Sequence, residues 1–197
     1  MSIAAEIAPG FEDAVHDVQR VFRRALEAFA HPGRVVAFDA KLRPPSPLFP
    51  SAAALALTLL DHGTTVFLDG VLDGEGVRQF LRFHCGAPLT TDPASASFAL
   101  IGDAEALRLD AFSIGTPEAP ERSTTAIVQV AGFDGAEPVR LKGPGIESER
   151  SFAVRGLAPS FWTQWRANAA LFPLGVDLVF ASPRAIAALP RSIKAEV

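Results

Sequence analysis

Apolar residues near the N-terminus recur at spacings of three and four, which is the period of one face of an α-helix. Aspartates near its start and arginines further along match the polarity of the helix dipole. On this helix Asp17 is expected to pair with Arg20, and Arg23 with Glu27. The helix should end before Pro32, because the residue ahead of a proline is displaced from the α region. The apolar positions are Phe11, Val15, Val18, Phe22, Leu26 and Phe29.

The rest of the chain alternates between short apolar runs and amphipathic segments. Ser51 is a plausible N-cap for one of the helices, and Asp103 could cap a short helix that runs to Leu109. Gly86 would end another helix in the left-handed conformation. Strands are expected at residues 34–38, 65–68, 97–101, 151–155 and 176–181, helices at 52–61, 75–85 and 160–170, and an extended segment at 187–192.

Two further apolar runs, at residues 125–130 and 138–142, flank Asp134-Gly135. This dipeptide between apolar runs is a strong hairpin signal, although the connection here is longer than two residues. We therefore expect the two runs to pair with each other.

Strands that alternate with helices are typical of an α/β protein. The expected hairpin interrupts the alternation and so indicates a mixed sheet covered on both faces. No internal repeat and no linker is evident, and we predict a single domain over residues 1–197 with three α/β/α layers.

The composition is rich in apolar residues, at 49%, while charged residues make up only 20%. A surplus of apolar surface beyond what one core needs would indicate an oligomer or a permanent partner. An alanine-rich composition without functional meaning explains the same numbers, and the composition does not separate these two interpretations.

Net charge and cysteine content restrict the compartment and the partners. The net charge of −4 without a basic patch makes nucleic acid an improbable partner. The lone Cys85 cannot form an intrachain disulfide, which fits a reducing compartment. Residues 1–10 lack the apolar stretch of a signal peptide, and no apolar run is long enough to cross a bilayer. We expect a cytoplasmic protein without a membrane partner.

The segment Lys142-Gly143-Pro144-Gly145 follows a predicted strand and is the first candidate site. Glycines allow a backbone to approach an anion, and Lys142, with Arg150 and His84, could then bind a phosphate. A plain structural turn is the alternative for the loop, because the glycine motif is incomplete, and a hydrogen-bonded core histidine is the alternative for His84. The same groups carry the rival hypothesis of a stand-alone phosphate- or nucleotide-binding enzyme.

Asp177 lies at the start of an apolar strand and needs a cation if it is buried. Arg191 and Arg150 are the candidates, and we expect a structural pair with Arg191. The four histidines show neither HxxxH nor HExxH spacing, so no metal site is predicted, and neither a catalytic nucleophile nor a cofactor site can be identified.

Several segments together resemble the PhnH family, which contributes a subunit to the bacterial carbon–phosphorus lyase complex. The resemblance runs from about Phe11 to the end of the chain. It rests on the order and spacing of QRVFR at 19–23, AFAHPG at 28–33, LRFH at 81–84, IGT at 114–116, PE at 120–121, LKGPGI at 141–146, FPLGVDL at 172–178 and LPRS at 189–192.

The resemblance implies a fold similar to a pyridoxal-phosphate-dependent transferase domain without its lysine and cofactor. It implies a homodimer in isolation and association with other core subunits in alkylphosphonate catabolism. The complex, a transferase, exchanges adenine of ATP for the phosphonate, and a different subunit breaks the carbon–phosphorus bond on an iron–sulfur cluster. With one cysteine and three lysines, this chain is expected to need no cofactor and to be inactive alone.

Overall fold

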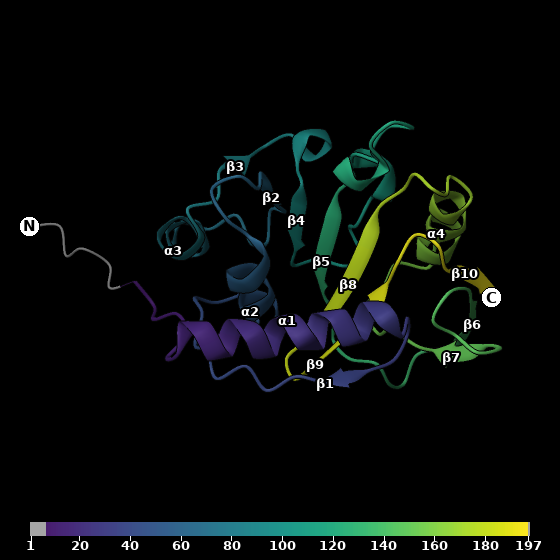
Figure 1. The fold of residues 1–197 in the computed structure, drawn as a ribbon, viewed down its shortest axis with the longest axis horizontal. Coiled ribbons are helices and arrows are strands. Elements are labelled where there is room, and N and C mark those ends of the chain that lie inside the picture. The colour runs from purple at the N-terminus through teal and green to yellow at the C-terminus, as the bar shows by residue number, and fades with distance from the viewer. Residues whose placement is uncertain (1–6, 197) are drawn as a thin grey trace, which may run out of the picture.

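The computed structural model describes residues 7–196. Residues 1–6, which belong to the segment expected to lack a signal peptide, lie outside the described part. Three short 3-10 turns, at Pro93–Ser95, Leu109–Ala111 and Pro120–Arg122, interrupt the connections. The helices and strands, in chain order (Figure 1), are α1 (Ala14–Ala30), β1 (Val36–Ala37), α2 (Pro50–Leu59), β2 (Val66–Leu68), α3 (Glu75–Cys85), β3 (Leu89–Thr90), β4 (Phe98–Ile101), β5 (Thr125–Gln129), β6 (Val139–Lys142), β7 (Arg150–Phe152), α4 (Phe161–Ala169), β8 (Asp177–Ser182), β9 (Ala185–Leu189) and β10 (Lys194–Glu196).

A seven-stranded mixed sheet forms the centre, with the order β1-β9-β8-β5-β4-β2-β3. The strands from β3 to β8 are parallel to their neighbours, while β9 and β1 are antiparallel. The mixed α/β class predicted from the sequence is therefore confirmed.

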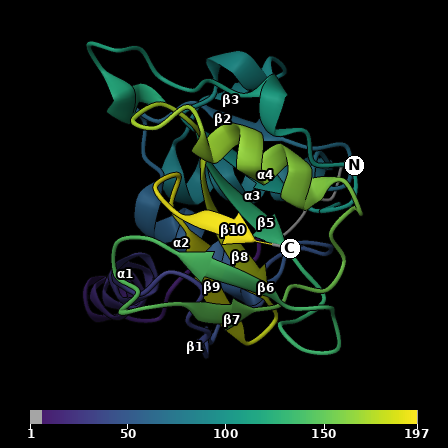
Figure 2. The same ribbon diagram turned by 90° about the vertical axis from the view of Figure 1, so that its right-hand side faces the viewer.

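Alternate residues of the central strands enter two separate cores. Along β8, Val179 and Ala181 pack on the side of α1, α2 and α3, whereas Leu178 and Phe180 pack on the opposite side. This follows from the two-residue period of a strand. The second face is covered by α4 together with a small three-stranded sheet, so that layer is not purely helical as predicted (Figure 2).

The hairpin predicted around Asp134-Gly135 is wrong. Strand β5 lies in the middle of the large sheet between β4 and β8, whereas β6 pairs with β7 and β10 in the small sheet. Gly135 does adopt a positive φ of 67°. The dipeptide therefore forms its turn, but the strands on either side of it find other partners.

Other local predictions fared unequally. Helix α3 ends where predicted, with Gly86 in the left-handed conformation at φ 64°. Helix α2 is capped by Phe49 and not by Ser51, whose buried hydroxyl donates to the carbonyl of Ser182. The carboxylate of Asp103 accepts two backbone N–H groups but starts no α-helix. Strands β3 and β10 had not been predicted.

Candidate functional site

The glycine loop after β6 packs against the carboxyl end of α1. Gly145 has a φ of 81°, and a Cβ at this position would overlap the carbonyl oxygen of Ala30. Gly143, at φ 147°, approaches Ile193 in the same way. Both glycines are therefore explained by backbone geometry and close packing. The carboxyl end of a helix carries partial negative charge, which is unfavourable for a bound anion.

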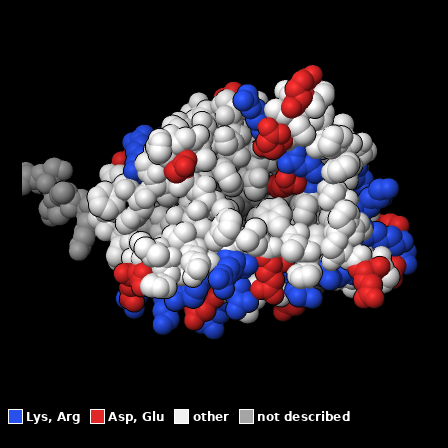
Figure 3. Space-filling view, viewed as in Figure 1, with Lys and Arg blue, Asp and Glu red and all other residues white. Residues whose placement is uncertain are grey.

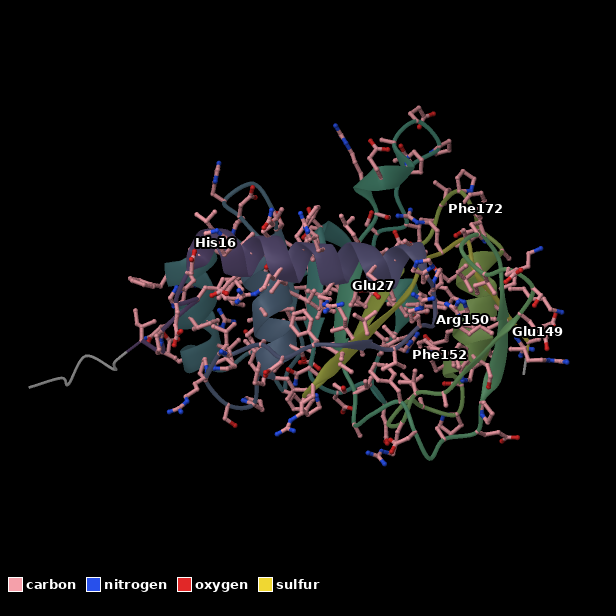
Figure 4. The ribbon with its side chains drawn as sticks, turned by 60° about the horizontal axis from the view of Figure 1, so that its bottom comes forward. His16, Glu27, Glu149, Arg150, Phe152 and Phe172 are labelled. Carbon is pink, nitrogen blue, oxygen red and sulfur yellow. The ribbon has the colours of Figure 1, made fainter. Side chains whose placement is uncertain are left out.

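The two cations predicted for this loop, Lys142 and Arg150, already have partners in the chain. The ammonium of Lys142 donates to both carboxylate oxygens of Glu196, at 3.0 Å each. These bonds lower the pKa of the Glu196 carboxyl below its ordinary value. The guanidinium of Arg150 donates to the carbonyls of His31 at 3.0 Å and Pro32 at 2.6 Å, beside the end of α1 that carries Glu27 (Figure 4). Arg150 thus caps the carboxyl end of α1.

His84 lies elsewhere, on α3. Its Nε2 is 2.9 Å from the carbonyl oxygen of Ala8, and its ring packs between Phe80 and Phe83. Helix α3 and the β6–β7 hairpin occupy opposite ends of the molecule (Figure 1). His84 therefore does not converge with Lys142, and the anion-binding loop stays a prediction, supported at most by the residues near β6.

Replacing Gly145 with alanine is expected to lower the free energy of unfolding by about 2 kcal/mol, because strained backbone costs ~1–3 kcal/mol. Lys142→Ala removes an exposed ion pair, worth less than about 1 kcal/mol, and should hardly change stability. Urea denaturation of both variants tests this. If Lys142→Ala were the more harmful change, the turn would not be the structural element described.

Asp177 and Arg191 are brought together as a half-buried pair. The side chains are 17% and 14% exposed. The carboxylate of Asp177 accepts from the backbone N–H of Arg191 at 2.8 Å and from its Nε at 3.1 Å. Arg191 also donates to the carbonyl of Pro120 at 2.8 Å. The pair thus joins the start of β8, the segment after β9 and the loop ahead of β5, and all its main polar groups are satisfied within the chain.

The described residues offer little for metal or thiol chemistry. Among residues 7–196, no three His, Cys, Asp or Glu side chains are placed to hold a metal ion. Burial raises the pKa of the Cys85 thiol to about 11. The thiolate, which is the reactive form, is therefore scarce at neutral pH.

The apolar face of α1 is the feature whose role the sequence reasoning missed. The residues that α1 buries are Val21, Ala25 and Ala28. The more apolar stripe is exposed instead, with Val15 at 77%, Leu26 at 52%, Phe22 at 46% and Val18 half-buried. A second stripe of small residues at the same period was the available signal, since small side chains allow a helix to approach a sheet closely.

The polar side of α1 carries several ion pairs. Arg20 pairs with Asp17 as predicted, but Glu27 pairs with Arg24 at 2.9 Å and not with Arg23. Charged side chains gather along the edge of the molecule formed by α1 and the segment after it, and the surface above α1 carries few charges (Figure 3). The helix therefore presents a charged side and an uncovered apolar side.

None of the helices in the described part of the chain is both long and apolar enough to cross a bilayer.

Comparison with known proteins gives one family. Residues 9–196 match the model of the family described as bacterial phosphonate metabolism protein (PhnH). The chain is 38% identical over 198 residues to the alpha-D-ribose 1-methylphosphonate 5-triphosphate synthase subunit PhnH of Rhizobium meliloti (strain 1021), covering 100% of this chain and 99% of the relative. It is 31% identical over 179 residues to HtxG of Stutzerimonas stutzeri, named as a C-P lyase subunit, covering 88% and 83% respectively.

Proposed function

The chain belongs to the PhnH family of bacterial phosphonate metabolism proteins, and we propose that it acts as a subunit of the carbon–phosphorus lyase complex. In this role it takes part in the ribose 1-methylphosphonate 5-triphosphate synthase reaction of alkylphosphonate catabolism. It does so without a catalytic centre of its own, either as a scaffold or by completing the site of a neighbouring subunit.

The observation that carries this proposal is the uncovered apolar stripe of α1, at Val15, Val18, Phe22 and Leu26. Exposed apolar surface of this kind is typical of a protein that functions in a stable complex with a partner. The near-complete coverage of a relative named as a synthase subunit supports the identity of the complex.

The positions of the three lysines support a role without pyridoxal phosphate. Lys41 and Lys194 are exposed, and Lys142 is bound to Glu196. A Schiff-base lysine needs a pocket with an aspartate or arginine partner for the cofactor. We therefore propose that the whole chain forms one domain, with a fold similar to that of a pyridoxal-phosphate-dependent transferase, and that this domain works without the cofactor.

The proposal is tested by incubating ATP with methylphosphonate and measuring the released adenine by chromatography. The purified chain should release no adenine, the complex co-expressed with the other synthase subunits should release it, and omission of this chain should abolish it. Turnover by the chain alone would overturn the proposal. Retained activity of the complex with Lys142→Ala would remove the stand-alone phosphate-binding alternative, which calorimetric titration with ATP tests independently.

We also propose that the isolated chain forms a homodimer through the α1 stripe. A twofold axis through such a contact pairs a patch with itself and runs the two helices antiparallel. The charged side chains on the other side of α1 already pair within the helix, as Arg20 does with Asp17 and Arg24 with Glu27, so the proposed contact rests on the apolar stripe.

The cytoplasm is the compartment that we propose for the protein. A single cysteine, Cys85, leaves no intrachain disulfide to depend on oxidising conditions.

A further inference from the structure

A second apolar surface lies beside α4, away from α1. It is a groove of about 690 Å³ between α4 and the segment 108–114. Its walls include Leu109, Ile114, Ala167 and Leu171, and we call it the α4 groove. Leu171 of this wall is 45% exposed, and Phe172, the next residue, is 61% exposed, so the apolar surface continues past the end of the groove.

The α4 groove has a fixed wall. The side-chain amide of Gln164 accepts from the backbone N–H of Leu109 at 3.1 Å and donates to the carbonyl of Leu107 at 3.4 Å. These two bonds tie the turn Leu109–Ala111 to α4. An apolar site that exists before its occupant arrives loses little free energy to ordering when it binds.

The charges at its rim neutralise each other. The guanidinium of Arg108 donates to both oxygens of Asp110, at 3.1 and 2.8 Å. No other charged side chain lines the groove among the described residues. The groove therefore does not attract a phosphonate or a nucleotide triphosphate, and it suits an uncharged, apolar occupant.

The concave shape of the groove makes a twofold contact of the groove with itself unfavourable. A twofold contact sets a surface against itself, and two concave surfaces cannot fill each other. If a different part of an identical chain filled the groove, the head-to-tail contact would repeat into a ring or an open filament. A segment of a different polypeptide satisfies the groove and closes the assembly.

We propose that the α4 groove binds an apolar segment of another subunit of the same complex, anchored by aliphatic or aromatic side chains. This inference rests on the proposed subunit role and adds a second surface to it. Helix α4 contacts β10 and the turn Leu109–Ala111, whereas α1 contacts α2, β1 and β9. The two helices lie on different parts of the molecule (Figures 1 and 2), and Phe172 lies well apart from His16 of α1 (Figure 4). Both surfaces can therefore be occupied at once.

Filling the groove gives the test. Ala167 is exposed on α4, so Ala167→Arg places a charged side chain in the groove without disturbing the core. Ala94→Arg makes the same change at an exposed alanine outside the groove. Each variant is tagged, co-expressed with the other synthase subunits and analysed by native mass spectrometry. Ala167→Arg should retain at least tenfold less of the other subunits than the wild type or Ala94→Arg, while its homodimer stays intact.

The outcomes separate the two proposals. Wild-type chain that retains no other subunit would refute the subunit role itself. Equal retention of the other subunits by wild type and Ala167→Arg would refute the groove proposal alone. The same holds if the wild type carries a small apolar molecule that Ala167→Arg lacks, while the complex stays intact in both. Thr163→Arg, at another exposed groove position, repeats the test should Ala167→Arg show an altered circular dichroism spectrum.

Discussion

Replacing Asp177 with alanine should lower the free energy of unfolding by about 3 kcal/mol, because it leaves Arg191 half-buried without its counter-charge. Arg191 is only 14% exposed, and Asp177 is the only carboxylate that its guanidinium meets among the described residues. The lost carboxylate also accepts a backbone N–H at 2.8 Å. The start of β8, the segment after β9 and the loop ahead of β5 therefore lose their common attachment.

The exposed pair Arg108–Asp110 provides the matched control. Its side chains are 70% and 68% exposed, and pairs of this kind contribute at most about 1 kcal/mol. Asp110→Ala should thus change the urea midpoint very little. Equal losses in Asp177→Ala and Asp110→Ala would show that burial does not decide the contribution of these ion pairs.

Replacing Phe22 with glutamate is expected to raise the Kd of the proposed homodimer by about a hundredfold or more. A central aromatic anchor contributes ~2 kcal/mol or more to an interface, and a carboxylate buried without a partner adds a further cost. Phe22 is 46% exposed in the single chain and lies near the middle of the α1 stripe. The change should therefore act on association and leave folding intact.

Sedimentation over a range of protein concentrations measures this effect. Phe83→Glu makes the identical substitution at a phenylalanine that is 67% exposed on α3, and it should leave the dimer unchanged. Val15→Glu, on the stripe, should weaken the dimer as Phe22→Glu does. A wild-type chain that stays monomeric at high concentration, or a dimeric Phe22→Glu, contradicts the assignment of the interface.

The sequence predicted best those features whose causes lie within a few residues. Helix α3 has its own periodicity and its own terminating glycine, Gly86, and both were predicted correctly. The end of α1 at Ala30 likewise follows from Pro32. The Asp177–Arg191 pair was expected for a reason that is also local, since a carboxylate at the start of an apolar strand requires a cation.

Predictions that depended on distant partners were less successful. The turn at Gly135 forms, yet β5 pairs with β4 and β8, because its alternating residues are needed in both cores. The period of α1 placed Val15, Phe22 and Leu26 on one face but could not tell which face the sheet would take. The sequence also did not reveal that the loop Lys142–Gly145 lies against the carboxyl end of α1, and anion binding by this loop stays a prediction.

From its amino acids alone this chain is an α/β protein of the PhnH type with one thiol and three amines, which restricts the chemistry it can host. The tertiary structure decided which apolar stripe of α1 is buried, which strands are neighbours and which cations already have partners. The physical reason is that hydrophobic period and turn preference are set by neighbours in the chain. Burial and hydrogen bonding depend instead on residues far apart in the chain, such as Arg150 and the carbonyl of His31, which are 119 positions apart.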